Sequence, residues 1–274
     1  MTTTLRPTGP LRLNADGTRS RHFQVCVNGR PVGALHLGTS AAFGDAVASV
    51  HDLRVEEPDR GRGRGTFALL AAEEVARGWG CSLIETTVPA GAEPALRLVR
   101  TLGYAVRNRG MEKRLGDRPP ALPDGSRARP MTEAEFGPWH EAQWEEYART
   151  WIERGVPEEA AYAKARGDRE RLLPRGRDTE GMRFSVLEHG GTRVGLLWLA
   201  LREDRAFVYK VAADAAHRGR GHGRALMLLA EIQAISAGLR VVGLNVFAGN
   251  TPAERLYASL GYETTQYAMQ KPLL

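Results

Sequence analysis

Residues 217–238 read HRGRGHGRALMLLAEIQAISAG, and the same pattern occurs 158 positions earlier, where residues 59–80 read DRGRGRGTFALLAAEEVARGWG. The alignment continues without a gap from GAEPALRLVRTLGY (91–104) to GNTPAERLYASLGY (249–262). A repeat of this length sets the organisation of a chain before any local assignment. The 274 residues are therefore expected to form two related modules. The same register carries two further identical pairs: Met111 with Met269, and Lys113 with Lys271.

A proline-rich segment separates the two copies. Residues 116–130 hold four prolines among turn-forming residues, which is typical of an exposed linker. We therefore expect a first module at 1–115, a linker at 116–130 and a second module at 131–274.

The second copy alternates β-type and α-type patterns. Short apolar runs bounded by turn residues predict strands, and apolar residues at helical spacing predict helices. Alternation of this kind favours an α/β class, here an α+β mixed sheet in each module. The expected strands are 183–188, 194–201, 206–213, 241–247 and 266–271. One expected helix follows the glycine-rich stretch, with apolar residues at helical spacing from Leu226 to Ile235 and a stop at Gly238, and the other is 252–260.

The first copy lacks a segment that the second copy has. Residues 132–173 have helical character and precede the strands of the second copy, whereas only about twenty residues occupy that place in the first. The first module is therefore expected to be truncated. The helical segment is rich in aromatic side chains, which could line a pocket or simply fill a helical core; they are Trp139, Trp144, Tyr147, Trp151 and Tyr162.

The glycine-rich stretch of the second copy has the properties of an anion site. It lies between a predicted strand and a predicted helix, and glycines allow the backbone to approach a ligand closely. The free N–H groups of a first helical turn attract phosphate. Neither a G-x-G-x-x-G fingerprint nor a P-loop lysine is present. The stretch consists of Arg218, Gly219, Arg220, Gly221, His222, Gly223 and Arg224.

This glycine-rich stretch, followed about 30 residues later by Asn250-Thr251-Pro252-Ala253 and by Leu256-Tyr257 and Leu260-Gly261-Tyr262, resembles the GNAT superfamily of acetyltransferases. The resemblance covers 127–274 well and 23–115 more weakly. It implies two tandem GNAT-type modules and an enzyme that transfers acetyl from acetyl-CoA to a primary amine of a small molecule or peptide by direct attack.

The resemblance also implies roles for particular residues of the second module. The glycine loop would bind the coenzyme A pyrophosphate, and a bulged strand at Val211, Ala212 and Ala213 would pair with the pantetheine arm. An amide exposed there would stabilise the oxyanion of the reaction. Asn250 would contact the coenzyme, and Tyr257 would protonate the leaving thiolate, although helical spacing alone also suits a core tyrosine.

A general base is not evident in the second module. The strand before the glycine loop, 206–213, contains no carboxylate. Glu141 and Glu145 on the preceding helical segment are candidates, as is a water molecule that relays the proton to solvent. We hypothesise that no single side chain is indispensable for deprotonation.

The first copy departs further from the family pattern. Its glycine loop at 60–65 is intact, but the 158-residue register places Ala92 opposite Asn250 and Val99 opposite Tyr257. We therefore expect a degenerate first module and catalysis in the second module. Whether the first module still binds coenzyme A stays open.

Composition narrows the remaining function classes. The net charge of +6 comes mainly from scattered arginines, a distribution that does not favour a nucleic-acid surface. The two cysteines have no metal-ligand spacing and suit a reducing compartment. No signal peptide or membrane span is evident. We expect a cytoplasmic protein without a metal. The alternative to an acetyltransferase is a non-catalytic acyl-CoA-binding or regulatory protein. The sequence specifies neither the acceptor nor the oligomeric state.

Overall fold

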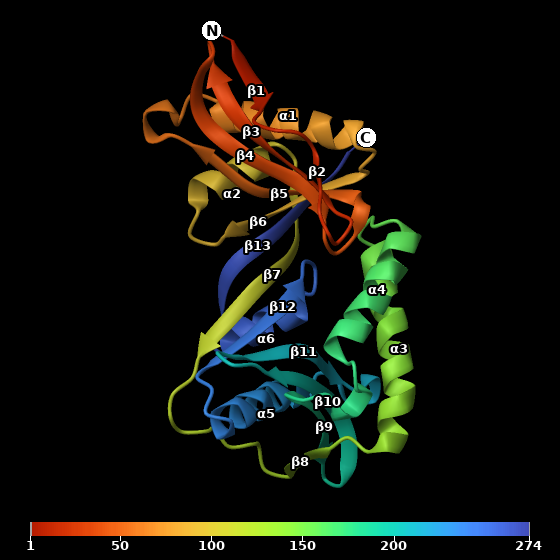
Figure 1. The fold of residues 1–274 in the computed structure, drawn as a ribbon. Helices are drawn as coiled ribbons and strands as arrows, with labels where there is room; N and C mark the ends of the chain where they lie inside the picture. The colour runs from red at the N-terminus through yellow and green to blue at the C-terminus, as the bar shows by residue number, and fades with distance from the viewer. Residues whose placement is uncertain (1, 274) are drawn as a thin grey trace. The chain divides into compact units, whose positions relative to one another are not determined.

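The computed structural model describes residues 2–273, so Met1 and Leu274, the end residues of the two expected modules, lie outside the described residues. The chain forms two compact units that alternate along the sequence (Figure 1). The first unit contains residues 2–107, 144–167 and 267–273, and the second contains 108–143 and 168–266. The mixed α/β class expected from the sequence is confirmed.

The first unit is built on a mixed sheet with strand order β1-β3-β4-β5-β6, followed by the end of β13. All neighbours from β1 to β5 are antiparallel, and β5 and β6 are parallel. Its elements are β1 (Thr3–Pro7), β2 (Arg12–Leu13), β3 (Arg19–Val27), β4 (Arg30–Ser40), β5 (Gly44–Val55), a 3-10 turn (Glu57–Asp59), α1 (Arg64–Gly78), β6 (Leu83–Pro89) and α2 (Glu93–Thr101).

The second unit repeats this plan with the order β7-β12-β11-β10-β9-β8. Here β11 and β12 are the parallel pair, and α5 packs against β10, β11 and β12. Its elements are β7 (Ala105–Arg114), β8 (Ser126–Pro130), β9 (Met182–His189), β10 (Thr192–Leu201), β11 (Ala206–Ala213), two 3-10 turns (Gly176–Asp178 and Ala215–His217), α5 (His222–Ser236), β12 (Val241–Phe247) and α6 (Thr251–Ser259). The chain continues into β13 (Glu263–Pro272), of which residues 263–266 lie in this unit and the remainder in the first.

The last strand of each repeat belongs to the unit of the other repeat. Residues 108–114 of β7 pair with β12, and Met111 lies in the core of the second unit. Met269 of β13 lies in the core of the first unit. The sequence modules and the compact units are therefore different divisions of the chain.

Two equivalent lysines accompany this exchange. The Nζ of Lys113 donates to both carboxylate oxygens of Glu231 at 2.8 and 2.9 Å, and Glu231 is 3% exposed. The Nζ of Lys271 donates to Glu73 at 2.7 Å, and Glu73 is 2% exposed. Each buried glutamate on a central helix thus has its cation from the end of the other repeat.

Helices α3 (Glu133–Ile152) and α4 (Glu158–Leu172) form where the sequence predicts helical character. Each is divided between the two units, because residues 144–167 belong to the first unit and the remainder to the second. The expected truncation of the first module is therefore not confirmed: the unit that holds the first glycine loop includes helical residues supplied by the segment between the repeats.

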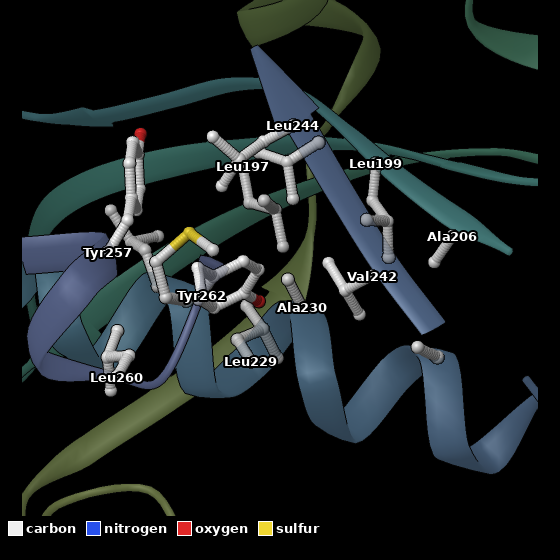
Figure 2. Close-up of a cluster of buried hydrophobic side chains, with 14 of the residues drawn as sticks. Leu197, Leu199, Ala206, Leu229, Ala230, Val242, Leu244, Tyr257, Leu260 and Tyr262 are labelled. Atoms are coloured by element: carbon white, nitrogen blue, oxygen red, sulfur yellow. The ribbon is translucent and has the colours of Figure 1, made fainter. Parts of the chain in front are cut away.

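The core of the second unit explains the helical spacing seen in the sequence. Leu229 and Ala230 of α5 meet Leu197 of β10 and Leu244 of β12 in one buried cluster (Figure 2). Leu226 of α5 belongs to the same cluster. Burial of such side chains contributes roughly 1.5–3 kcal/mol each. The cluster fixes α5 on the sheet and thereby fixes the glycine loop at its N-terminus.

Candidate functional site

The parallel strands of each unit pair over only a few residues. In the second unit, Ala206–Val208 of β11 pair with Val242–Leu244 of β12. In the first unit, Val47–Val50 of β5 pair with Leu83–Thr86 of β6. Beyond these points the ladder ends, so backbone N–H and C=O groups at the strand edge are available to an extended ligand that carries amides.

A β-bulge marks the point where the strands separate. The register of β10 and β11 shifts between Trp198 and Leu199, which leaves Tyr209 as the extra residue on β11. A bulge was expected at Val211–Ala213, and it lies earlier in the strand because residues 211–213 keep regular antiparallel pairing: Val211 with Leu197, Ala212 with Leu196, and Ala213 with Gly195. The first unit has its bulge at the equivalent residue, His51.

The glycine loop of the second unit prepares a helix N-terminus. Gly219 and Gly221 adopt φ values of +77° and +85°, a region that side-chain-bearing residues rarely occupy. Gly221 is the N-cap of α5, and no side chain within residues 2–273 caps this helix. The N–H groups of His222, Gly223 and Arg224 are therefore those of an uncapped first turn, which favours an anion.

The side chains of this loop have separate roles. Arg218 ends the preceding 3-10 turn, and Arg224 donates to the Ser259 hydroxyl at 2.7 Å. His222 is buried, and burial lowers the pKa of its imidazole, so this side chain is neutral at pH 7. Its backbone, rather than its ring, is the part that suits an anion. Gly219, Arg220, Gly221 and Gly223 complete the loop.

The loop of the first unit has the same construction. Gly61 and Gly63 adopt φ values of +70° and +75°, and Gly63 is the uncapped N-cap of α1 over the described residues. A cavity of about 700 Å³ opens at this loop. This volume is in the range of small-molecule sites. Its lining comes from β5, the loop, β6 and α2, and includes His51, Asp52, Arg60, Arg64, Thr86 and Leu98.

Asn250 and Tyr257 of the second unit both lie on α6. The Oδ1 of Asn250 accepts from the N–H of Ala253 at 3.3 Å, so its side chain caps the helix. Tyr257 is 8% exposed, and Figure 2 shows its ring against the buried cluster with the hydroxyl directed away from Tyr262. Burial raises the pKa of the Tyr257 phenol, which therefore stays protonated at neutral pH.

The two candidate carboxylates are ion-paired on helix surfaces. Glu141 accepts from Arg169 at 2.8 Å and belongs to the second unit with Tyr257. Glu145 accepts from Arg149 at 2.9 Å and from the Tyr162 hydroxyl at 3.0 Å. It belongs to the first unit. The structure therefore does not place both glutamates in the unit of the predicted site.

Two aspects of the site were not predicted. The first unit carries an imidazole and a carboxylate, His51 and Asp52, on the strand that lines its cavity. Extending the 158-residue register back from the glycine loops would have aligned His51 with Tyr209 and Asp52 with Lys210, and so have found them. The aromatic residues of α3 also divide: Trp139 packs on Phe184 and Trp198, whereas Trp151 packs on Phe43 of the first unit.

Within residues 2–273, no helix is long and apolar enough to cross a membrane. Nor does this part of the chain gather three histidine, cysteine or acidic side chains in a way that could hold a metal ion.

Comparisons with known proteins agree on one family. The sequence model of the Acetyltransferase (GNAT) family matches residues 2–104 and 136–262. A mycothiol acetyltransferase from Thermobispora bispora is 32% identical over an alignment of 268 positions that covers 90% of this chain and 88% of the relative. The uncharacterized N-acetyltransferase YdgE from Bacillus subtilis is 31% identical over 149 residues, 52% of this chain and 95% of the relative.

A solved structure shares the fold. The GCN5-related N-acetyltransferase from Sphaerobacter thermophilus has a TM-score of 0.58 and 23% sequence identity, with 92% of this chain and 80% of that chain covered. The similarity extends over both units and supports a tandem arrangement of two GNAT modules.

Proposed function

Because the chain belongs to the acetyltransferase (GNAT) family, we propose that its second module transfers acetyl from acetyl-CoA to a primary amine of a small molecule or peptide. The uncapped first turn of α5 beside the diverging strands β11 and β12 is the observation that carries this proposal. A diphosphate on that turn and a pantetheine arm along the free edge of β11 would bring the thioester to the point of divergence.

The acceptor is proposed to be a small molecule. Relatives that match about nine-tenths of this chain have the name mycothiol acetyltransferase, which describes a small-molecule substrate class. The alternative of a non-catalytic acyl-CoA-binding protein is not favoured by a family whose named relatives are acetyltransferases. Thiol release from acetyl-CoA in an amine panel, beside thermal stabilisation by coenzyme A alone, separates the two; stabilisation without turnover would support the binder.

The proposed reaction is direct attack of the amine on the thioester. The ammonium loses a proton, the nitrogen lone pair attacks the carbonyl carbon, and the carbonyl oxygen becomes an oxyanion. A backbone amide near the bulge of β11 would stabilise this charge. The carbonyl then re-forms as the carbon–sulfur bond breaks with its electron pair on sulfur, and the Tyr257 phenol would protonate the departing thiolate. The second proton on nitrogen would pass through water to restore the phenol.

Tyr257→Phe tests the proposed acid. We expect kcat for acetyl transfer to fall 10- to 100-fold with little change in KM for acetyl-CoA, because only proton donation is removed. Since burial raises the pKa of this phenol, the wild-type rate should not decline through loss of the acid below pH 10. Steady-state rates from pH 6 to 10 for both chains give the measurement. An unchanged kcat would show that Tyr257 only packs in the core.

Glu141→Gln and Glu145→Gln test the hypothesis that no single carboxylate is indispensable as base. Both side chains already accept from arginines on helix surfaces. Each substitution is therefore expected to lower kcat/KM less than tenfold. A loss above about a hundredfold, the size expected for a general base, from either one would refute the hypothesis. Arg169→Gln, which removes the partner of Glu141, controls for loss of the ion pair alone.

A further inference from the structure

The two units carry different side chains on the same framework. In the second unit Phe184 is opposite Trp198 on neighbouring strands, and Tyr209 is the bulge residue beside them. In the first unit the equivalent positions hold three histidines: His22 is opposite His36, and His51 is the bulge residue. An apolar aromatic stack in one unit thus corresponds to a stack of titratable rings in the other.

The three imidazoles form a continuous column across β3, β4 and β5. The ring centroids of His22 and His36 are 4.0 Å apart with an angle of 12°, and those of His36 and His51 are 4.7 Å apart. The Nε2 of His36 is buried and has no hydrogen-bond partner within residues 2–273. A buried ring nitrogen in this state is unusual, and the ring contributes to the column by stacking.

The surroundings keep the middle ring neutral. Burial lowers the pKa of His36, and the neighbouring His22, His51 and Arg12 lower it further, whereas Asp52 opposes them. A neutral imidazole is a proton acceptor at physiological pH. The column therefore places an uncharged ring against His51.

The column reaches the cavity at the first glycine loop. His51 and Asp52 line this cavity together with Arg60 and Arg64 of the loop. His51 is also the bulge residue at which β5 leaves the parallel ladder with β6. A bulge redirects a side chain, and bulges often lie next to active sites. An acyl chain extended along the free edge of β5 from the glycine loop would present its thioester beside this imidazole.

We propose that the first unit is a second acyl-transfer site, in which His51 is the general base that deprotonates an amine acceptor. This inference rests on the proposed use of acetyl-CoA as the acyl donor. His36 and His22 are positioning residues whose stacked rings hold His51.

The step balances without a further reactant. One proton passes from the ammonium of the acceptor to His51 and then to solvent. The nitrogen lone pair forms the carbon–nitrogen bond, and the carbon–sulfur bond breaks with its electron pair on sulfur. The second proton on nitrogen passes through water to the thiolate. Val99 replaces the phenol of Tyr257 here, and a thiolate is stable enough to leave without a dedicated acid.

The experiment separates the two sites by disabling one glycine loop at a time. Gly223→Asp places a carboxylate in the second loop, and Gly65→Asp does the same in the first. Thiol release from acetyl-CoA is measured with four amine probes: glucosamine, tyramine, spermidine and a lysine peptide. The Gly223→Asp chain is expected to retain turnover with at least one probe. Adding His51→Ala is expected to lower that turnover at least a hundredfold, and millimolar imidazole to restore part of it.

His189→Ala in the Gly223→Asp chain is the matched control, since it removes an exposed imidazole of the second unit without touching the first unit; turnover there should be unchanged. The proposal is overturned if Gly223→Asp shows no turnover while calorimetry still finds coenzyme A bound, if His51→Ala leaves turnover unchanged, or if imidazole restores none of it. Turnover by Gly65→Asp alone would uphold the function proposed for the second module and reject this one. Turnover by the Gly223→Asp chain and none by the Gly65→Asp chain would uphold the second acyl-transfer site and reject the function proposed for the second module.

Discussion

Gly223→Asp is expected to lower the affinity of the second glycine loop for coenzyme A about a thousandfold. A carboxylate roughly 4 Å from a bound phosphate, at an effective dielectric constant of about 20, adds about 4 kcal/mol of repulsion, which corresponds to that factor. The fold should persist, because an acidic side chain in the first turn of α5 is favourable to the helix dipole. Isothermal titration with coenzyme A gives the measurement.

A matched pair of substitutions separates charge from packing. A Cβ at Gly223 would lie 3.1 Å from a methyl of Leu256, and a Cβ at Gly65 would lie 3.0 Å from a methyl of Leu98. Gly223→Ala therefore introduces the same contact without charge, and a loss of no more than tenfold is expected. If alanine and aspartate weakened binding equally, the loop would not be a diphosphate site.

Lys113→Met is expected to lower the free energy of unfolding by about 3–5 kcal/mol, because it leaves Glu231 as an uncompensated buried charge. Glu231 accepts two hydrogen bonds from Lys113 and is 3% exposed. Lys271→Met is the equivalent change in the first unit, where Glu73 is 2% exposed. Urea denaturation of the two variants gives the measurement.

The double variant Lys113→Met with Glu231→Leu is the control. It removes both charges, so it is expected to be within about 1.5 kcal/mol of the wild type or more stable. A Lys113→Met chain as stable as the wild type would mean that Glu231 takes up a proton or finds water in the folded state.

The second copy shows how much local pattern can predict. The strands expected at 206–213 and 241–247 form as β11 and β12, and the helix expected at 252–260 forms as α6 within one residue. Apolar periodicity reports which face of an element is buried, and α5 buries the face that the pattern indicates. The bulge was misplaced toward 211–213, because its position depends on cross-strand register, which local sequence does not encode.

The sequence does not predict which unit β7 and β13 join, and the reason is different. Met111 and Met269 are identical residues in identical registers, as are Lys113 and Lys271. Either strand therefore satisfies either core, and the chemistry of the repeat does not distinguish a strand's own unit from the other. The pattern of Asn250 and Tyr257 does not predict His51, because that pattern covers the helix after β6 and not the strand that lines the cavity.

The exchange of β7 and β13 makes the two halves of the polypeptide mutually dependent. A fragment that stops before residue 116 would lack the buried methionine of its own core, and its terminal strand would expose an apolar edge. Dividing the polypeptide at the proline-rich segment would therefore yield two aggregation-prone fragments, each with an incomplete core. Co-expression of the two fragments would let each supply the strand that the other lacks.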